Sequence, residues 1–281
     1  MRREEVGFKY DRHCFQLERE LKIRNYSKRT VQSYTQAFYQ YRKFIRELNQ
    51  DISLLDEDTV KDFLLGKKEQ NCSPKTLNVY LSAIKFFYRE IVKDPHQIQI
   101  KFAKRNKKNP VVLEHEEILK IIGTFQNLKH KLIVSLAYGS GLRVSEVVNL
   151  KIHDIDFNQG LIYVRQGKGR KDRVTVFPKS LTKDINRLVN SYNGNYVFVS
   201  QKGGKMSTRT LQKIFKMALK RAHIQKPATF HSLRHSFATH LLQAGVNLRY
   251  LQELLGHSDV RTTEIYTRVT NSGLKNIVSP L

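Results

Sequence analysis

The residues that could carry out chemistry lie mainly near the C-terminal end of the chain. His231 and Arg234 are three positions apart, a spacing that puts two side chains on one face of a helix. With Arg143, far upstream, they could hold the non-bridging oxygens of one phosphodiester, because a guanidinium donates two parallel hydrogen bonds to such oxygens. Tyr266 is then the candidate nucleophile. This combination indicates the cleavage of phosphodiester bonds.

Three further side chains could assist such a reaction. A phenol with a pKa of about 10 must lose its proton before it attacks, and His231 is a candidate base. Lys168 lies between two glycines in a predicted hairpin turn, where it could protonate the leaving 5′ oxygen or simply contact the DNA backbone. His257 could donate a hydrogen bond to the phosphate, or it could cap a helix or fill the core. The residue types leave both alternatives open for Lys168 and His257.

A helix predicted to begin at His231 would separate charged side chains from apolar ones. At about 100° per residue, one arc carries His231, Arg234, His235 and Ala238, and another carries Leu233, Phe237, Leu241 and Ala244. We expect the first arc to face DNA and the second to pack against the core. His231 and His235 could also bind a metal ion together. Catalytic zinc usually takes three protein ligands, however, and the chain has no HExxH pattern, so no metal site is expected.

The composition points to a polyanionic partner. The chain has 281 residues, with 50 Lys and Arg against 25 Asp and Glu and a formal net charge of +25. Such self-repulsion is usually offset by phosphates or acidic lipids. No long apolar run or signal-like start stands out, so we expect nucleic acid as the partner and no membrane. The use of cysteine indicates a reducing cytoplasm as the expected location. Cys14 and Cys72 have no CxxC spacing, which indicates neither a disulfide framework nor a thiolate zinc site.

The first hundred residues are predicted to be wholly helical. Ser27 is a suitable N-cap before an apolar stripe, a second helix begins near Asp56, and Ser73-Pro74 begins a third. We assign residues 1–104 to an N-terminal domain and residues 105–111 to a basic linker, because Asn109-Pro110 resists helix continuation. The basic run is either a solvated connector or a strap along DNA. Its expected DNA-binding residues are Lys101, Lys104, Arg105, Lys107 and Lys108.

Residues 112–281 are assigned to a second domain, in which helices surround a small sheet. Helices are expected over 118–138, 144–150, 210–222, 231–244 and 248–254, with strands over 161–164 and 174–177 and a further strand over 197–199. Gly139-Ser140-Gly141 interrupts the helical pattern, so Arg143 lies at a turn that enters a helix. Lys171 and Arg173, beside the hairpin turn, are expected to bind phosphates.

Along nearly its whole length the chain resembles the tyrosine recombinases, the phage integrase family, and is most similar to Xer-like site-specific recombinases. The most specific segments are His231-Ser-Leu-Arg234-His235-Ser-Phe-Ala-Thr-His240-Leu241, Leu254-Leu255-Gly256-His257-Ser258 and Tyr266-Thr267. The resemblance implies that Tyr266 forms a 3′-phosphotyrosyl link, that Lys168 is the general acid, and that His257 assists. The remaining members of the implied catalytic set bind and activate the scissile phosphate: Arg143, His231 and Arg234. The family needs neither ATP nor metal, so no cofactor is expected.

The resemblance also implies a mainly α-helical fold with a small β-sheet, arranged as a two-domain DNA clamp. An all-helical, SAM-like core-binding domain would precede the catalytic tyrosine recombinase domain. The implied partner is double-stranded DNA, with self-assembly to a tetramer on two DNA sites, and a second recombinase or an accessory protein could be required. The implied role, in the cytoplasm and associated with the nucleoid, is chromosome dimer resolution in chromosome segregation, or DNA integration and excision of a mobile element. Integron integrases share the motifs but resemble longer chains, with an insertion not found in this sequence, and that subgroup stays open as an alternative.

Two other functions stay open on the sequence. A DNA-binding regulator on the same scaffold would bind DNA without cutting it, and its usual sign would be a lost Tyr or Arg. None of the six matching positions is lost. A type IB topoisomerase would use the same chemistry to relax supercoils without exchanging strands between partners.

Overall fold

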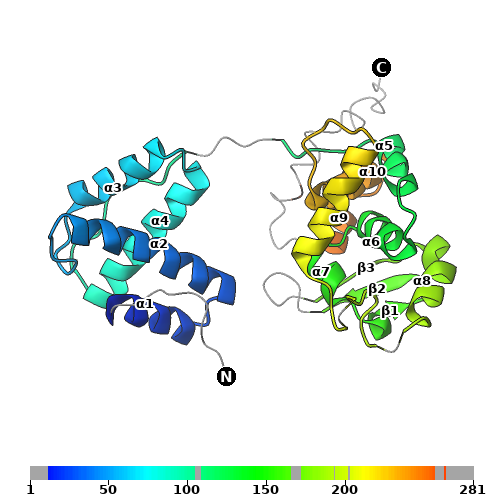
Figure 1. Cartoon of the computed structure of the whole chain (residues 1–281), viewed down its shortest axis with the longest axis horizontal. Helices are drawn as coiled ribbons and strands as arrows, with labels where there is room; N and C mark the ends of the chain where they lie inside the picture. The colour runs from blue at the N-terminus through cyan, green and yellow to red at the C-terminus, as the bar shows by residue number, and fades with distance from the viewer. Residues whose placement is uncertain are drawn as a thin grey trace, which may run out of the picture. The chain divides into compact units, whose positions relative to one another are not determined.

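The computed structural model describes residues 12–104, 109–165, 172–192, 194–201, 203–256 and Thr263. The chain divides into two compact units, Met1–Lys107 and Lys108–Leu281, termed the N-terminal unit and the C-terminal unit (Figure 1). The described residues are mostly helical, with a three-stranded sheet in the C-terminal unit. The predicted fold class, mainly α with a small β-sheet, is therefore confirmed.

The N-terminal unit consists of helices around one apolar core. Its described elements are α1 (Arg12–Ile23), α2 (Lys28–Glu47), α3 (Glu57–Glu69), α4 (Pro74–Phe87) and the π-helix η1 (Tyr88–Val92). Ser27, Asp56 and Ser73 each accept a hydrogen bond from a backbone N–H in the first turn of α2, α3 and α4, as their sequence context predicts. Phe38 and Phe87 meet in the core with 4.2 Å between ring centroids. The caps and the apolar faces together fix this helical unit.

An asparagine in the left-handed conformation follows each of the first three helices. The backbone φ angle is 58° at Asn25, 53° at Asn49 and 58° at Asn71. The next residue then bonds back onto the helix, as Gln50 N does to Ile45 O at 3.2 Å. Asparagine adopts this conformation more readily than most residues that carry a side chain. One residue type therefore ends three helices.

The segment that leaves the N-terminal unit is fixed along α4. Asn78 Nδ2 donates to Ala103 O at 3.1 Å, and Ala103 N donates to Asn78 Oδ1 at 2.8 Å. Lys85 Nζ donates to Ile100 O at 2.8 Å. These contacts pair backbone groups outside any helix or strand, as buried peptide groups require. They fix the backbone of this segment up to Ala103.

The C-terminal unit combines seven described α-helices with the sheet. Its elements are α5 (His115–Gly123), α6 (Leu128–Gly139), α7 (Val144–Asn149), η2 (Ile152–Asp154), β1 (Ile155–Asp156), β2 (Leu161–Val164), β3 (Arg173–Val176), η3 (Lys179–Leu181), α8 (Thr182–Val189), α9 (Thr208–Arg221), α10 (Phe230–Gln243) and α11 (Leu248–Leu255). The strands are antiparallel in the order β1-β2-β3, and Val164 pairs with Arg173 at the end of the β2–β3 hairpin where the chain passes from one strand to the other. The hairpin was predicted almost to the residue.

Three features of this unit differ from the sequence prediction. The expected helix over 118–138 is two helices, because α5 ends at Gly123 and Asn127 caps a new one by accepting from His130 N at 3.2 Å. The expected strand over 197–199 contributes only an isolated bridge, between Val199 and Lys205. Helix α8 was not predicted. Each of these differences involves a helix end or a short element. The spacing of apolar residues predicts such features poorly.

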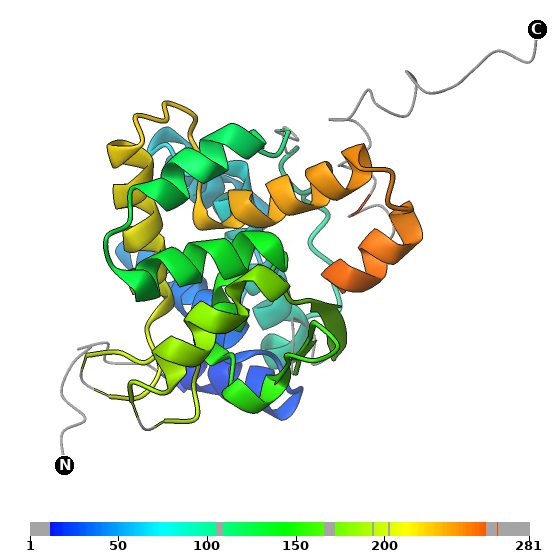
Figure 2. The same ribbon diagram turned by 90° about the vertical axis from the view of Figure 1, so that its right-hand side faces the viewer.

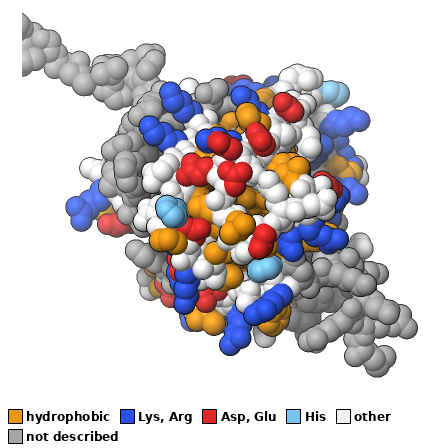
Figure 3. Space-filling model, turned by 90° about the vertical axis from the view of Figure 1, so that its left-hand side faces the viewer, with side chains coloured by type: hydrophobic (Ala, Val, Ile, Leu, Met, Phe, Trp, Pro, Cys, Tyr) orange, Lys and Arg blue, Asp and Glu red, His pale blue; other side chains and the backbone are white. Residues whose placement is uncertain are grey.

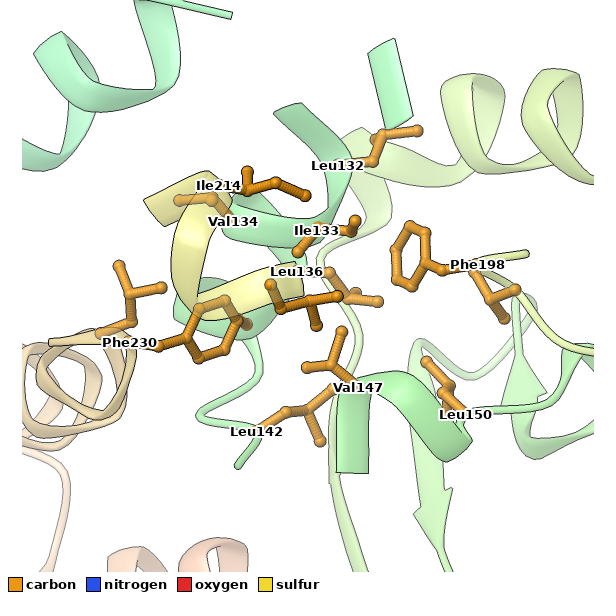
Figure 4. Packing of buried hydrophobic residues seen from close by; sticks show 14 of the residues in the cluster. Leu132, Ile133, Val134, Leu136, Leu142, Val147, Leu150, Phe198, Ile214 and Phe230 are labelled. Atoms are coloured by element: carbon orange, nitrogen blue, oxygen red, sulfur yellow. The ribbon is translucent and has the colours of Figure 1, made fainter. Parts of the chain in front are cut away.

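Helix α6 runs through the middle of the C-terminal unit. Its consecutive residues Leu132, Ile133 and Val134 are all buried, so no side of this stretch faces solvent. Figure 4 shows Leu136 among apolar side chains from other parts of the chain, including Val147 of α7. Helix α10 packs against α6, and α11 lies beside α10 and β3 (Figure 2). The core thus holds together the elements that carry Arg143, His231 and Arg234.

The surface of the N-terminal unit is not uniformly basic. Figure 3 shows a face on which acidic side chains gather near apolar ones. Several large apolar side chains of this unit are exposed, including Phe15, Ile23 and Leu54. Among the helices of the described residues, none is both long and apolar enough to span a bilayer.

The left-handed helix ends can be tested at Asn49. We expect Asn49→Ala to lower the free energy of unfolding of the N-terminal unit by about 1 kcal/mol, because a Cβ-bearing residue without a short polar group is strained at positive φ. Asn49→Gly is the matched control and should cost less, since glycine adopts this conformation freely. Urea denaturation would measure both. Equal losses for the two variants would contradict the assignment.

Candidate functional site

Part of the predicted site lies within the described residues. Arg143, His231 and Arg234 are described, and all three belong to the C-terminal unit. Lys101 and Lys104 are described as exposed residues of the N-terminal unit, and Arg173 is described on β3. The other predicted residues lie outside the described residues: Lys168, His257 and Tyr266 of the catalytic set, and Arg105, Lys107, Lys108 and Lys171 of the DNA-binding set.

Arg143 is held at the start of α7. The turn before it needs a left-handed residue, which Gly141 supplies with φ +60°. Arg143 N donates to Glu146 Oε2 at 2.7 Å, and Arg143 Nη1 donates to Glu146 Oε1 at 2.8 Å. Arg143 Nη2 also lies 3.4 Å from Leu255 O. Backbone and side chain are therefore fixed by one carboxylate.

Glu146 is the centre of the site, and the sequence analysis missed it. Its carboxylate is buried and binds Arg173 through two hydrogen bonds, Nη1 to Oε1 at 2.6 Å and Nη2 to Oε2 at 2.9 Å. Arg234 Nη1 lies 4.0 Å from Oε2. Burial by itself would raise the pKa of Glu146, but the hydrogen bonds and charge of Arg173, with those of Arg143, lower it to about 2. A glutamate three residues after Arg143 fits a capping box, the signal that could have identified it.

Arg234 lies inside the unit. Its residue exposure is 1%, although the expected charged arc of this helix was to face DNA. Nη1 donates to Gly141 O at 2.7 Å, and Nη2 donates to Leu255 O. Ala238, from the same expected arc, is buried as well, because α6 and α11 cover α10. The expectation that this arc faces DNA is thus wrong for Ala238, whereas contact between Arg234 and a phosphate stays a prediction.

His231 and His235 form a second part of the site. His231 is exposed in the first turn of α10, as expected of a residue that meets a substrate. The His231 and His235 rings lie edge to face with 4.5 Å between centroids. Burial, together with the charges of His231 and Arg234, lowers the pKa of His235 to about 4. His235 is therefore neutral near pH 7.

Arg173, which is expected to bind a phosphate, lies buried at the start of β3. It is 9% exposed, and its guanidinium is bonded to Glu146 and, through Nε at 2.8 Å, to Leu254 O. The neighbouring Val174 and Val176 are 41% and 37% exposed, whereas Thr175 is fully buried. Strand β3 therefore turns its polar residues inward and its valines outward, opposite to the usual pattern. Phosphate binding by Arg173 stays a prediction, and its guanidinium is already bonded to protein groups.

Three arginines meet at the C-terminal end of α11. Arg173 donates to Leu254 O, and Arg143 and Arg234 approach Leu255 O. The last carbonyls of a helix lack partners within it and carry partial negative charge, so guanidinium groups stabilise them. With the single carboxylate of Glu146, the cluster keeps a net positive charge. A buried positive cluster of this kind attracts a phosphate group.

Metal ligands do not assemble in the part of the chain that the structure describes. No group of three or more His, Cys, Asp and Glu side chains lies close enough there to hold an ion. The described chemistry of the site is thus that of arginines, histidines and one carboxylate.

Gly141 provides a test of how tightly the site is packed. A Cβ at this position would lie 2.4 Å from Phe237 Cδ1, on top of the strain of φ +60°. We expect Gly141→Ala to destabilise the C-terminal unit by about 3 kcal/mol. Gly123→Ala is the control, because nothing lies within 4 Å of its Cβ and it belongs to α5. Chemical denaturation would compare them, and a wild-type midpoint for Gly141→Ala would refute the close packing.

The shifted pKa of His235 predicts how stability depends on pH. Its value is about 4 in the folded chain against 6.5 ordinarily, so the unfolded chain binds more protons between these values. Stability should therefore fall as pH drops from 6.5 towards 4, by at most about 1.4 kcal/mol per pH unit for one proton. His235→Asn should flatten this part of the stability curve. The protonation of Glu146 should lower stability only as the pH falls from 4.5 towards its pKa of about 2.

The matched control for this measurement is His223→Asn. His223 is exposed and has φ 54°, which asparagine tolerates, so its replacement should leave the curve unchanged. Free energies of unfolding from urea titrations at several pH values give both curves. Parallel curves for wild type and His235→Asn would show that His235 is not the group responsible.

Both units match known family descriptions. Residues 111–272 match the phage integrase family, and residues 15–98 match the phage integrase N-terminal SAM-like domain. The two matches follow each other along the chain in the order of the two units.

Known relatives share most of the length of this chain. Tyrosine recombinase XerA of Pyrococcus horikoshii is 38% identical over 263 residues, which are 92% of this chain and 89% of the relative. Tyrosine recombinase XerD of Listeria monocytogenes serovar 1/2a is 31% identical over 276 residues, 90% of this chain and 92% of the relative. A crystal structure of XerA recombinase is similar with a TM-score of 0.55 and 27% identity, covering 94% of this chain and 96% of that one. The chain therefore belongs to the phage integrase family of tyrosine recombinases.

Proposed function

We propose that the chain is a site-specific DNA recombinase that cleaves and rejoins strands through a 3′-phosphotyrosyl intermediate on Tyr266. The observation that carries the proposal is the buried cluster in which Arg143 and Arg234, from distant parts of the sequence, lie around one carboxylate. Two arginines fixed in this cluster can stabilise the negative charge that develops on a phosphate during nucleophilic attack. Membership of the tyrosine recombinases supports the same chemistry.

The arginines would act on the scissile phosphate without leaving Glu146. A guanidinium has five N–H donors, and Glu146 takes only part of those of Arg143. The side chain of Arg143 is partly exposed, so its remaining donors could meet a non-bridging oxygen. Arg234 would stabilise the second oxygen from the interior. Because the cluster is formed before DNA arrives, little reorganisation is required during the reaction.

The covalent step transfers the phosphodiester from one oxygen to another. The Tyr266 oxygen bonds to phosphorus, the bond from phosphorus to the 5′ oxygen breaks, and the phenolic proton passes to a base, for which His231 is our candidate. Lys168 would protonate the leaving 5′ oxygen, and His257 would donate a hydrogen bond to the phosphate. Attack by a 5′ hydroxyl of the partner duplex reverses the step. The ester conserves the energy of the broken bond, so no ATP is required, and the family resemblance implies that no metal is required either.

The proposed partner is double-stranded DNA. Lys101 and Lys104 are exposed on the segment that is bonded to Asn78 of α4 through Ala103, and we propose that they contact phosphates together with Arg105, Lys107, Lys108 and Lys171. Strand exchange between two sites would use a tetramer, with a second recombinase or an accessory protein where the reaction requires one. The biological setting would be the nucleoid in the cytoplasm, for chromosome dimer resolution or for movement of a mobile element.

The proposal is tested by trapping the covalent intermediate. The chain's binding site would first be isolated from genomic DNA by footprinting, and a duplex carrying that site with a nick beside the scissile phosphate would be offered. Wild type should form a protein–DNA adduct, and Tyr266→Phe should form none while it binds the duplex as tightly, because only the attacking oxygen is removed. Tyr250→Phe is the control, since Tyr250 is 66% exposed on α11, and it should form the adduct normally.

The trapping assay distinguishes a regulator from a recombinase, and a supercoil-relaxation assay distinguishes a topoisomerase. A regulator would bind the duplex without any adduct in the wild type. A topoisomerase would form the adduct and relax supercoiled DNA as a monomer without exchanging strands between two sites. An adduct formed by Tyr266→Phe would show that another residue is the nucleophile.

A further inference from the structure

Arg173 lies where three separate parts of the C-terminal unit meet. It begins β3, it binds Glu146 of α7 through both carboxylate oxygens, and it donates to Leu254 O in the last turn of α11. Its side chain is 5% exposed. A buried cation with three charge-assisted or helix-end bonds of 2.6–2.9 Å is a fixed structural joint rather than a surface charge.

Gly256 gives an independent sign that α11 rests on this arginine. Gly256 ends α11 in the left-handed conformation, with φ +62°. A Cβ at Gly256 would lie 2.5 Å from Arg173 Cδ and 3.5 Å from Arg173 Nε. The backbone of Gly256 therefore packs directly on the aliphatic part of the Arg173 side chain. Helix α11 and strand β3 are joined there by both packing and a hydrogen bond.

The strand itself is arranged around this joint. Arg173 and Thr175 point into the unit, and Thr175 Oγ1 donates to Ser140 O at 2.9 Å, next to the turn that leads to Arg143. Val174 and Val176 are left partly exposed. Leaving valines exposed while polar side chains are buried costs free energy of folding. The hydrogen bonds of Arg173 must therefore compensate for the inward orientation of the Arg173 and Thr175 side chains.

The joint lies beside the residues of the proposed reaction. Arg173 and Arg143 share the same carboxylate oxygen, Glu146 Oε1, at 2.6 and 2.8 Å. In the sequence, Lys168 is five residues before Arg173, and His257 directly follows Gly256. One side chain thus connects the clamp at Arg143 to the hairpin and to the helix end from which the chain continues to His257.

We propose that Arg173 is a positioning residue of the active centre: it joins β3 and the end of α11 to Glu146, and it thereby sets the geometry of Arg143 for strand cleavage. This inference rests on the proposed function for its catalytic consequence, but the joint itself does not. A lysine cannot replace it, because an ammonium has no planar fork for two carboxylate oxygens and a carbonyl.

The competing role for Arg173 is contact with a DNA phosphate. Loss of a phosphate contact weakens DNA binding. It also reduces, by about one, the slope of the logarithm of the binding constant against the logarithm of the salt concentration. A lost positioning contact leaves binding and its salt dependence intact and lowers the rate of the chemical step. Displacement of reacting groups by about 1 Å can cost about a hundredfold in rate. The two roles therefore predict opposite patterns in binding and cleavage.

The experiment compares Arg173→Lys and Arg173→Gln with wild type in the full-length chain. The control is Arg187→Gln, which removes the same charge from an exposed position on α8. Three quantities are measured: the dissociation constant for the duplex at several salt concentrations, the single-turnover rate of adduct formation at saturating DNA, and hydrogen–deuterium exchange of the α11 amides without DNA. We expect unchanged binding and salt slope, a cleavage rate lowered about tenfold or more in both variants, and faster exchange in α11. Arg187→Gln should behave as wild type.

Other results would overturn the inference. A wild-type cleavage rate in Arg173→Lys would show that charge alone suffices, and a smaller salt slope with unchanged α11 exchange would show a phosphate contact. If Arg173→Gln does not fold, the cleavage rate and α11 exchange of Arg173→Lys decide whether Arg173 has the positioning role. If wild type forms no adduct, the proposed reaction fails, whereas the exchange data still report on the joint. Unchanged α11 exchange in both variants would refute the joint whatever the wild type does.

Discussion

The carboxylate of Glu146 is the interaction on which the C-terminal unit is organised. A buried carboxylate is costly unless it is paired and hydrogen-bonded, and Glu146 meets that requirement with Arg143 and Arg173. Those two arginines come from α7 and β3, and Arg234 of α10 lies 4.0 Å away. The chain elements that carry the candidate site are therefore held in place by one side chain that takes no part in the proposed chemistry.

The end of α11 complements this carboxylate. Its last carbonyls accept hydrogen bonds from the same arginines, so each guanidinium is fixed from two sides. Fixed cations in a site from which water is largely excluded interact more strongly with a phosphate than mobile surface cations do. The stability of the cluster and its proposed affinity for a transition state thus have one cause, the burial of more positive than negative charge.

Helix starts and the β2–β3 hairpin could be predicted from the sequence, whereas the burial of two arginines could not. Ser27, Asp56 and Ser73 marked three helix starts, and the β2–β3 hairpin followed from two β-type runs with a glycine-rich turn. Local chemistry determines such features, so local patterns reveal them. The motif residues also pointed to the family, which the similarity to known recombinases bears out.

The burial of Arg173 and Arg234 did not follow from the sequence pattern, which placed Arg173 beside a hairpin turn and Arg234 on the charged arc of a helix. On β3 the two valines are partly exposed while Arg173 is buried, and on α10 Arg234 is among the most buried large side chains. Both inversions are explained by Glu146 and by the carbonyls of α11, which lie far from them in the sequence. A prediction from local sequence pattern fails where a functional site buries charged residues. Both residues for which it fails, Arg173 and Arg234, belong to the candidate site.

The most direct measurement is the single-turnover rate of covalent adduct formation by Glu146→Gln beside wild type on the same nicked duplex. Glutamine keeps the size of the side chain but removes the charge that holds Arg143 and Arg173, and thermal unfolding would verify that the variant is folded. We expect the rate to fall by about tenfold or more, while the dissociation constant for DNA is unchanged. A folded Glu146→Gln variant that cleaves at the wild-type rate would contradict the central role of this carboxylate.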